Sequence, residues 1–262
     1  MASGIVTLTT DFGLSDHYVG VMKGVILRFN PQARIIDLCH QVSAYDVLGA
    51  GFILAASYPY FPPGTLHLVV VDPGVGGPRR PIVVEAEPWL FVAPDNGVLE
   101  PVYRRHPHRV WSLAAEAFAL KPISNTFHGR DVFAPAAGLL SRGDPPERMA
   151  EPIEDFARLQ IPSPREIEPG RREGEILHVD RFGNLVTNFQ PEDLPDRFLL
   201  TVGRARVQTL RQSYMEAKTG EIFAIAGSSG FVEISMKQAS AAQEAGVGAG
   251  AAVGLVDPDA VE

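Results

Sequence analysis

A buried strand, a glycine-rich turn and a second strand follow one another in residues 68–86. The apolar run Leu-Val-Val-Val at 68–71 delivers the carboxylate of Asp72 to the end of a strand. Arg79 follows within the same segment, near enough to fold back over the glycine-rich turn. Since ligands of parallel sheets bind at the carboxyl ends of the strands, we expect a binding site at this turn.

The residues after the turn distinguish it from the nucleotide-binding loop of a Rossmann methyltransferase. That loop is also rich in glycine, but it opens a helix. In this chain Pro78 and Pro81 flank two arginines, and a strand pattern follows directly. We therefore expect a strand–loop–strand element. A methyltransferase stays an alternative, and a requirement for a methyl acceptor would favour it.

The arrangement of strand and helix patterns divides the chain into two domains. Strands and helices alternate to about residue 140, which predicts an α/β N-terminal domain over 1–160 with a mostly parallel sheet and helices on both faces. Prolines, a glycine and charged residues predict a linker over 161–173. Short, spaced strand patterns then predict a smaller all-β, barrel-like C-terminal domain over 174–262.

Composition excludes several classes of partner. The 262 residues carry a formal net charge of −8 and no basic cluster, so we expect no nucleic-acid partner. The single cysteine, Cys39, excludes an internal disulfide and favours a cytoplasmic location. There is no signal-peptide pattern, no apolar run long enough to cross a bilayer, and no cluster with metal-ligand spacing. We expect neither membrane insertion nor a bound metal.

Two candidate sites contain carboxylates at predicted strand ends. Asp11 follows the first strand, where a carboxylate can accept hydrogen bonds from the diol of a ribose; a helix N-cap is the other interpretation. Asp72 and Arg79 form the second candidate. A neighbouring guanidinium keeps a carboxylate ionised, and such a pair can hold a water molecule, although it can also be a structural ion pair.

Two further candidates follow along the chain. His128 precedes a glycine at a predicted strand-to-helix corner, where an imidazole can face a cleft and handle a proton, or be purely structural. In the second domain, Asp180, Phe182 and Asn184 combine carboxylate, aromatic and amide groups that can recognise the edge and face of a nucleobase. The alternative is a turn in which the two polar side chains bond local backbone.

Several motifs in this order resemble those of the S-adenosyl-L-methionine (SAM) hydroxide adenosyltransferases, the hydrolase relatives of fluorinase and chlorinase. The shared motifs are Thr10-Asp11-Phe12-Gly13, Val71-Asp72-Pro73-Gly74-Val75-Gly76 with Arg79, Pro94-Asp95-Asn96-Gly97, Phe127-His128-Gly129-Arg130-Asp131, Asp180-Arg181-Phe182-Gly183-Asn184 and Ser228-Ser229-Gly230-Phe231. The resemblance covers nearly the whole chain. It implies that SAM is a substrate and not a cofactor, and that SAM and water are converted to adenosine and L-methionine.

The resemblance also implies an assembly and a role for individual residues. The expected assembly is a homotrimer in which the ligand lies between the N-terminal domain of one subunit and the C-terminal domain of the next. Catalysis is expected from Asp72, Arg79 and His128, and ribose binding from Asp11. Adenine contacts are expected from Phe182, Asn184 and the segment Ser228–Phe231. Methionine contacts are expected from Asp180 and Ser228, and Glu233 is expected to lie close to the ligand.

The chain departs from the halogenating members of this family at telling positions. His128 and Gly129 stand where the fluorinase has a tyrosine and a halide-binding serine, and Asp72 and Val75 stand where it has a tyrosine and a threonine. Tyr45 replaces a tryptophan and is expected to keep an aromatic wall near the reacting carbon. These changes favour attack by water. A chlorinase-like halogenase and a non-catalytic adenosine- or SAM-binding protein stay as alternatives.

The chemistry of this reaction requires activation of water more than assistance to the leaving group. The sulfonium leaves C5′ as a neutral thioether, so no general acid is needed. Water is a weak nucleophile that must be aligned opposite sulfur and relieved of a proton. Asp72, kept ionised by Arg79, is the candidate acceptor, and His128 is expected to orient the water or pass the proton on.

Overall fold

A computed structural model describes residues 2–260 of the chain. The chain divides into two compact units, Met1–Gln160 and Ile161–Glu262, and each is described by itself. Within residues 2–260, no helix combines the length and the apolar character needed to cross a bilayer.

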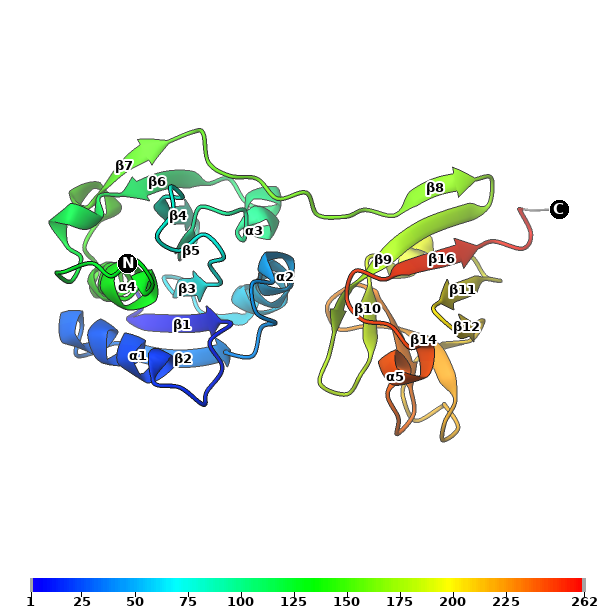
Figure 1. Ribbon diagram of the computed structural model, residues 1–262. Helices are drawn as coiled ribbons and strands as arrows, with labels where there is room; N and C mark the ends of the chain where they lie inside the picture. Colours follow the sequence, from blue (N-terminus) through cyan, green and yellow to red (C-terminus); the bar gives the residue numbers. More distant parts are fainter. Residues whose placement is uncertain (1, 261–262) are drawn as a thin grey trace. The chain divides into compact units, whose positions relative to one another are not determined.

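The first unit is built on a seven-stranded sheet with the strand order β2-β1-β3-β5-β4-β6-β7 (Figure 1). Its strands are β1 (Ile5–Thr10), β2 (Arg34–Cys39), β3 (Leu66–Val70), β4 (Pro81–Ala86), β5 (Trp89–Pro94), β6 (Arg109–Leu113) and β7 (Ala150–Ile153). Its helices are α1 (Tyr18–Phe29), α2 (Val47–Ser57), α3 (Glu100–Arg105) and α4 (Ala134–Arg142), the last preceded by the π-helical segment η3 (Gly129–Phe133).

The prediction of a mostly parallel sheet is wrong, because the sheet is mixed. Strands β2, β1, β3 and β5 pair in parallel, whereas β5, β4, β6 and β7 pair antiparallel. The reason lies in the connection between β4 and β5. Only Glu87 and Pro88 separate these strands, and so short a connection permits only an antiparallel hairpin.

Helices cover both faces of this sheet, as predicted. Successive side chains of a strand point to opposite faces, and β3 shows the division clearly. Leu68 packs in the core that contains Met22 of α1 and residues of α4. Val69 packs in the other core, with Leu54 of α2 and residues of α3. The chain after β3 continues as a loop, residues 71–80, into β4, which confirms the strand–loop–strand element.

The second unit is β-rich and forms a curled, half-barrel sheet with the order β12-β11-β16-β9-β10-β15-β14-β13, to which β8 is added beside β9 (Figure 1). Its strands are β8 (Arg165–Glu168), β9 (Arg171–Val179), β10 (Leu185–Thr187), β11 (Leu199–Val202), β12 (Ala205–Val207), β13 (Leu210–Arg211), β14 (Ile222–Ala226), β15 (Val232–Met236) and β16 (Ala252–Val256). One short helix, α5 (Ala241–Ala245), precedes β16.

The segment predicted to be a linker, 161–173, is partly sheet. It contains β8 and the first residues of β9, which pair antiparallel with each other. All four residues of β8 are exposed, and charged residues dominate it, so its sequence lacks the apolar alternation by which a strand is recognised. Backbone pairing with β9 therefore determines this strand, not burial of its side chains.

Candidate functional site

A cavity of about 300 Å³ opens at the carboxyl ends of β1 and β3 in the first unit. Its lining comes from residues after β1 (Asp11, Phe12, Tyr18), from the stretch before α2 (Ala44, Tyr45), from β3 and its following loop (Val70, Asp72, Val75) and from the segment that leads into η3 (Thr126, Phe127, His128 and Gly129, the first residue of η3). Four residues that the sequence singled out line the cavity, namely Asp11, Tyr45, Asp72 and His128. A fifth, Arg79, contacts Asp72.

Asp72 and Arg79 form a buried ion pair across the loop between β3 and β4. The Nε atom of Arg79 donates to both carboxylate oxygens of Asp72, at 3.0 and 2.9 Å, and Nη2 donates to Oδ2 as well. The side chains are only 10% and 5% exposed. Arg79 is further held over the ring of Phe133, 5.3 Å from its centroid. These charge-assisted hydrogen bonds give the Asp72 carboxylate a fixed orientation.

His128 joins this pair from the other side of the cavity. Nη2 of Arg79 lies 2.8 Å from Nδ1 of His128. Because a guanidinium only donates, Nδ1 accepts, and the neutral imidazole carries its proton on Nε2. Burial lowers the pKa of His128 below its ordinary value of 6.5, and the charge of Arg79 lowers it further, against the smaller opposing effects of Asp72 and Asp131. The three groups therefore form a chain with a carboxylate at one end and an N–H donor at the other.

Glycine makes the tight course of the β3–β4 loop, residues 71–80, possible. Gly76 has φ of +75°, in the left-handed region that side chains rarely adopt. A Cβ atom on this residue would lie 2.3 Å from the carbonyl oxygen of Asn125. The loop therefore packs directly against the backbone that leads to His128, and this close approach brings Arg79 into contact with His128.

Asp11 shapes the rim of the cavity through Tyr45. One carboxylate oxygen of Asp11 accepts from the backbone N–H of Tyr45 at 2.9 Å, so this residue does not cap a helix. Tyr45 has φ of +68°, an unusual conformation for a residue with a bulky side chain, and the residue is 72% exposed. Strained backbone of this kind is concentrated at functional sites.

The second unit holds a separate polar cluster at the turn between β9 and β10. Oδ1 of Asp180 accepts from the backbone N–H groups of Phe182 and Asn184, both at 2.9 Å, which is the local turn bonding that the sequence left open. The side-chain amide of Asn184 donates to Oδ2 of Asp180 at 2.8 Å. Phe182 is 75% exposed beside the half-buried Asp180 and the buried Asn184. Such an aromatic face is suited to stacking against a planar base.

Tyr214 extends this cluster and was missed by the sequence analysis. Its hydroxyl lies 3.4 Å from the amide nitrogen of Asn184 and donates to Oε2 of Glu233 at 3.2 Å. Burial raises the pKa of Glu233 against the opposing effect of the hydrogen bond from Tyr214, and the charge of Asp180 adds a smaller increase. Tyr214 lies in a loop with no recognisable motif, so only the folded structure shows that it joins two predicted residues.

The remaining predicted residues lie in the turn between β14 and β15. This turn is closed by hydrogen bonds from the N–H of Gly227 to the carbonyl of Phe231, at 2.8 Å, and from Gly230 to Gly227, at 3.1 Å. Ser228 is exposed in the turn, whereas the hydroxyl of Ser229 is buried. Glu233 follows in β15, so these residues belong to the same end of the sheet.

Some of the lining of the first cavity was also missed. Phe12, Tyr18 and Phe127 form an aromatic cluster with ring centroids 5.1 to 6.1 Å apart. Phe12 and Phe127 lie within recognised motifs, but neither motif indicates that their rings meet. Among residues 2–260, no group of three or more His, Cys, Asp or Glu side chains is arranged to hold a metal ion.

Two family models match the chain, one for each unit. The model described as the SAM hydroxide adenosyltransferase N-terminal domain matches residues 6–150, and the corresponding C-terminal domain model matches residues 174–254. Four curated relatives named (R)-S-adenosyl-L-methionine hydrolase are 34–36% identical to the chain. For the relative from Thermus thermophilus, 36% identity extends over 96% of this chain and 99% of the relative.

A solved structure and a more distant relative complete the comparison. The crystal structure of an uncharacterized conserved protein from Thermotoga maritima is 37% identical, with a TM-score of 0.87, and covers 97% of this chain and 100% of its own. A relative named fluorinase, from Nocardia brasiliensis, is 23% identical over 72% of each chain. The chain is thus more similar to the relatives named as hydrolases than to this halogenating relative.

Proposed function

Because the chain belongs to the SAM hydroxide adenosyltransferase family, we propose that it hydrolyses SAM to adenosine and L-methionine. The observation that carries this proposal is that Arg79 joins Asp72 to His128, two residues that line the same cavity. This arrangement presents an ionised carboxylate and a neutral imidazole N–H to the same small space, and both groups are suited to binding a water molecule.

The proposed reaction is a single displacement at C5′ of the ribose. A lone pair of the water oxygen forms the new bond to C5′ while the C5′–S bond breaks, and its electron pair goes to sulfur. L-Methionine leaves as a neutral thioether, and the water gives up one proton. SAM and one water molecule thus give adenosine, L-methionine and one proton.

The residues of the cavity divide this work between them. Asp72 accepts the proton of the attacking water, and Arg79 keeps it ionised and oriented. His128 donates from Nε2 to the water oxygen, because Nδ1 is already occupied by Arg79. Alignment of the water lowers the activation free energy by several kcal/mol, and proton transfer to Asp72 raises the rate by about 10²–10⁴-fold.

Substrate binding is assigned to residues outside this water site. Asp11 would accept hydrogen bonds from the ribose hydroxyls, and the ring of Tyr45 would pack beside the reacting carbon. In the second unit, Phe182 would stack on adenine, Asn184 and the Ser228–Phe231 turn would contact its edge, and Asp180 and Ser228 would contact the methionine portion. Glu233 supports this set through Tyr214.

The configuration at sulfur is a further part of the proposal. The sulfonium of SAM is a stereogenic centre, and the four relatives at 34–36% identity are named for the R form. We extend this preference to the present chain. Assays with each epimer supplied separately test it, and equal turnover of both would remove this part of the proposal.

Assembly and location stay as proposals. We propose a homotrimer, as the resemblance implies, and a cytoplasmic setting that suits a chain with one free cysteine, Cys39. Light scattering of the dilute protein tests the first. An active monomer would contradict it.

The decisive experiment uses labelled water. The protein is incubated with SAM in ¹⁸O water, and the products are separated by chromatography and weighed by mass spectrometry. Hydrolysis at C5′ places one ¹⁸O atom in adenosine and none in L-methionine. A methylated acceptor with S-adenosylhomocysteine would indicate a methyltransferase, and binding without any product would indicate a sensor. Asp72→Asn serves as the inactive control.

A further inference from the structure

The turn between β5 and α3, residues 94–97, contains no residue of the proposed reaction, yet it contacts the β3–β4 loop, residues 71–80, at two places. We propose that its residues Asp95 and Asn96 are positioning residues that fix both ends of the β3–β4 loop, residues 71–80. The proposal rests on the proposed function for the role of that loop, and it assigns to the turn the task of holding Asp72 and Arg79 in register.

Asn96 holds the beginning of the loop. Its amide nitrogen donates to the carbonyl oxygen of Val71 at 2.9 Å, and its amide oxygen accepts from the N–H of Val98 at 3.1 Å. Val71 is fully buried and directly precedes Asp72. A buried carbonyl that loses its partner is destabilised, so this bond fixes the direction in which the chain leaves β3.

Asp95 holds the end of the loop. One carboxylate oxygen accepts from Nε and Nη2 of Arg80, at 3.1 and 2.8 Å, and the backbone N–H of Asp95 donates to the carbonyl of Arg80 at 2.9 Å. The carboxylate is 6% exposed. Arg79 and Arg80 are therefore neighbours with opposite tasks, because Arg79 contacts Asp72 and His128 while Arg80 anchors the loop to the turn.

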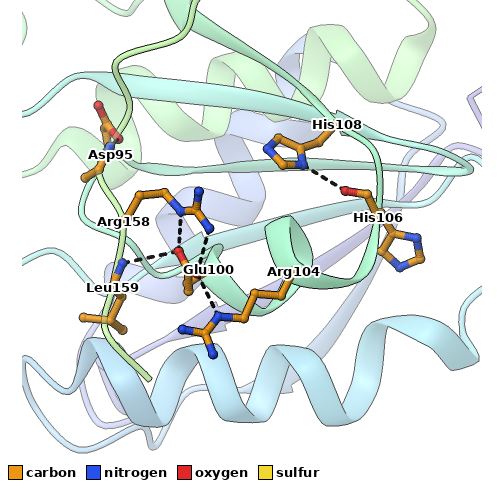
Figure 2. Close-up of polar contacts among 8 residues, drawn as sticks. Asp95, Glu100, Arg104, His106, His108, Arg158 and Leu159 are labelled. Atoms are coloured by element: carbon orange, nitrogen blue, oxygen red, sulfur yellow. Dashed lines mark hydrogen bonds and ion pairs between the residues drawn. The ribbon is translucent and has the colours of Figure 1, made fainter. Parts of the chain in front are cut away.

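The turn itself is held in place by the last segment of the first unit. The other carboxylate oxygen of Asp95 accepts from the N–H of Ala157 at 2.7 Å. Glu100, buried at the start of α3, accepts from the Nε and Nη2 atoms of Arg158, at 2.6 and 2.9 Å, and from Arg104 (Figure 2). Figure 2 shows the backbone nitrogen of Leu159 directed at the same carboxylate.

This support matters because the loop is flexible by composition. Residues 71–80 include Gly74, Gly76 and Gly77, and a glycine-rich segment has more backbone freedom than any other. With its ends fixed, the loop has one arrangement in which the Asp72 carboxylate meets the water. A displacement of about 1 Å at such a group lowers turnover by about 10²-fold.

The test compares variants that remove a bond without removing bulk. Asn96→Asp keeps the shape of the side chain but loses the N–H that binds Val71, and Arg80→Gln removes the charge that binds both Asp95 and Asp155. Both should lower kcat for adenosine formation by about 10- to 100-fold, with KM for SAM changed less than about threefold. Asp155→Asn removes the other ion-pair partner of Arg80, a carboxylate that is 83% exposed, and leaves the bonds from Arg80 to Asp95 in place, so it should retain the wild-type kcat.

A second measurement separates positioning from activity. The pKa of His128, followed by NMR and assigned with His128→Gln, reports the nearby charge of Arg79 together with the carboxylates of Asp72 and Asp131. If the loop loosens and Arg79 withdraws, this pKa rises in folded Asn96→Asp and Arg80→Gln proteins. A wild-type protein that forms no adenosine overturns the proposed function. Folded variants with unchanged kcat and an unchanged His128 pKa overturn the positioning role.

Discussion

The guanidinium of Arg79 lies 2.8 Å from Nδ1 of His128, so one cation touches both the imidazole and the carboxylate of Asp72. This arrangement orients the carboxylate of Asp72 and at the same time disfavours a second positive charge on His128. The same residue therefore holds the proposed proton acceptor in place and favours the neutral form of the imidazole.

Replacement of either end of this chain should lower turnover while leaving ligand binding largely intact. Asp72→Asn removes the proton acceptor and His128→Ala removes the donor that orients the water, so each should reduce adenosine formation by about 10²-fold or more. Binding of SAM by calorimetry should stay within about tenfold, or about 1.4 kcal/mol. Asp196→Asn makes the same chemical change at an exposed position. It should leave both quantities unchanged, whereas unchanged turnover in the first two variants would end the proposed mechanism.

The pH dependence of kcat/KM should show an acid limb centred below pH 6.5. The pKa of His128 is lowered by burial and by Arg79, so the imidazole is neutral above that lowered value and protonated below it. Protonation breaks the bond from Arg79 to Nδ1, and activity falls as the pH drops through the pKa of the folded protein. Initial rates between pH 4.5 and 9 measure the limb, and His128→Gln should abolish it. A limb centred above pH 7 would contradict the assignment.

Gly76→Ala should harm both stability and activity. The substitution forces a side chain into φ of +75° and places its Cβ 2.3 Å from the carbonyl oxygen of Asn125. Gly220→Ala is the matched control, because Gly220 has φ of +78° but no atom within 4 Å of the added Cβ. The control should lose about 1–2 kcal/mol of unfolding free energy from strain alone. Gly76→Ala should lose more and turn over SAM at least about tenfold more slowly; equal effects would refute the close packing.

His67 should make the protein less stable in acid without affecting catalysis. The ring is fully buried, stacks on Phe91 with centroids 5.1 Å apart and shares a hydrogen bond with Thr7 at 2.8 Å. Burial lowers its pKa to about 3, so the unfolded chain binds an extra proton between that value and about 6.5. The free energy of unfolding should therefore fall by up to about 1.4 kcal/mol per pH unit as the pH drops through this window.

Denaturant unfolding at several pH values measures this dependence. His67→Gln cannot titrate there and keeps a group able to bond Thr7, so its stability should depend less steeply on pH between 4 and 6. Other carboxylates affect both proteins alike, and the difference in slope isolates His67. Parallel slopes would show that this residue does not carry the effect.

The sequence predicted those parts of the molecule whose signal is local. Apolar runs identified β1 and β3, and the motif around Asp72 and Arg79 led to a pair that the structure brings into one cavity. The direction of strands was not predictable in the same way. Buried parallel and antiparallel strands are both apolar, and only the two-residue connection between β4 and β5 distinguishes them. An exposed, charged strand such as β8 has no apolar pattern at all.

Contacts between distant residues could not be predicted either. The bond from Asn96 to the carbonyl of Val71 joins two motifs that were both recognised, but no pattern within either motif indicates the other. Tyr214 lies outside every motif and reaches Asn184 and Glu233 only because β13 and β14 pair. Side chains that position a functional residue through tertiary contacts have no spacing rule, and therefore they appear only in the folded structure.

High concentrations of chloride or fluoride should not make a halogenated nucleoside the main product. A halide must shed its water before it attacks, so it needs hydrogen-bond donors and little negative charge nearby. In this chain Asp72 stands at a position where the family resemblance implies a tyrosine in the halogenating members. An ionised carboxylate about 4 Å from an incoming anion repels it by about 4 kcal/mol at an effective dielectric near 20. Arg79 offsets part of this repulsion, so slow incorporation of chloride is compatible with the structure, but water should prevail.

Halogenation is also not expected when a hydroxyl is introduced at Gly129, the position at which the family resemblance implies a halide-binding serine in the halogenating members. A Cβ at this position would lie 3.1 Å from the sulfur of Met22 and 3.3 Å from the ring of Phe127, so a serine side chain has little room. Gly129→Ser should therefore lose hydrolysis without gaining halogenation, since Asp72 still repels the anion. The assay supplies SAM with molar halide and separates adenosine from 5′-halo-nucleoside. If the halo-nucleoside dominates with the wild-type protein, the hydrolase assignment fails and a halogenase takes its place.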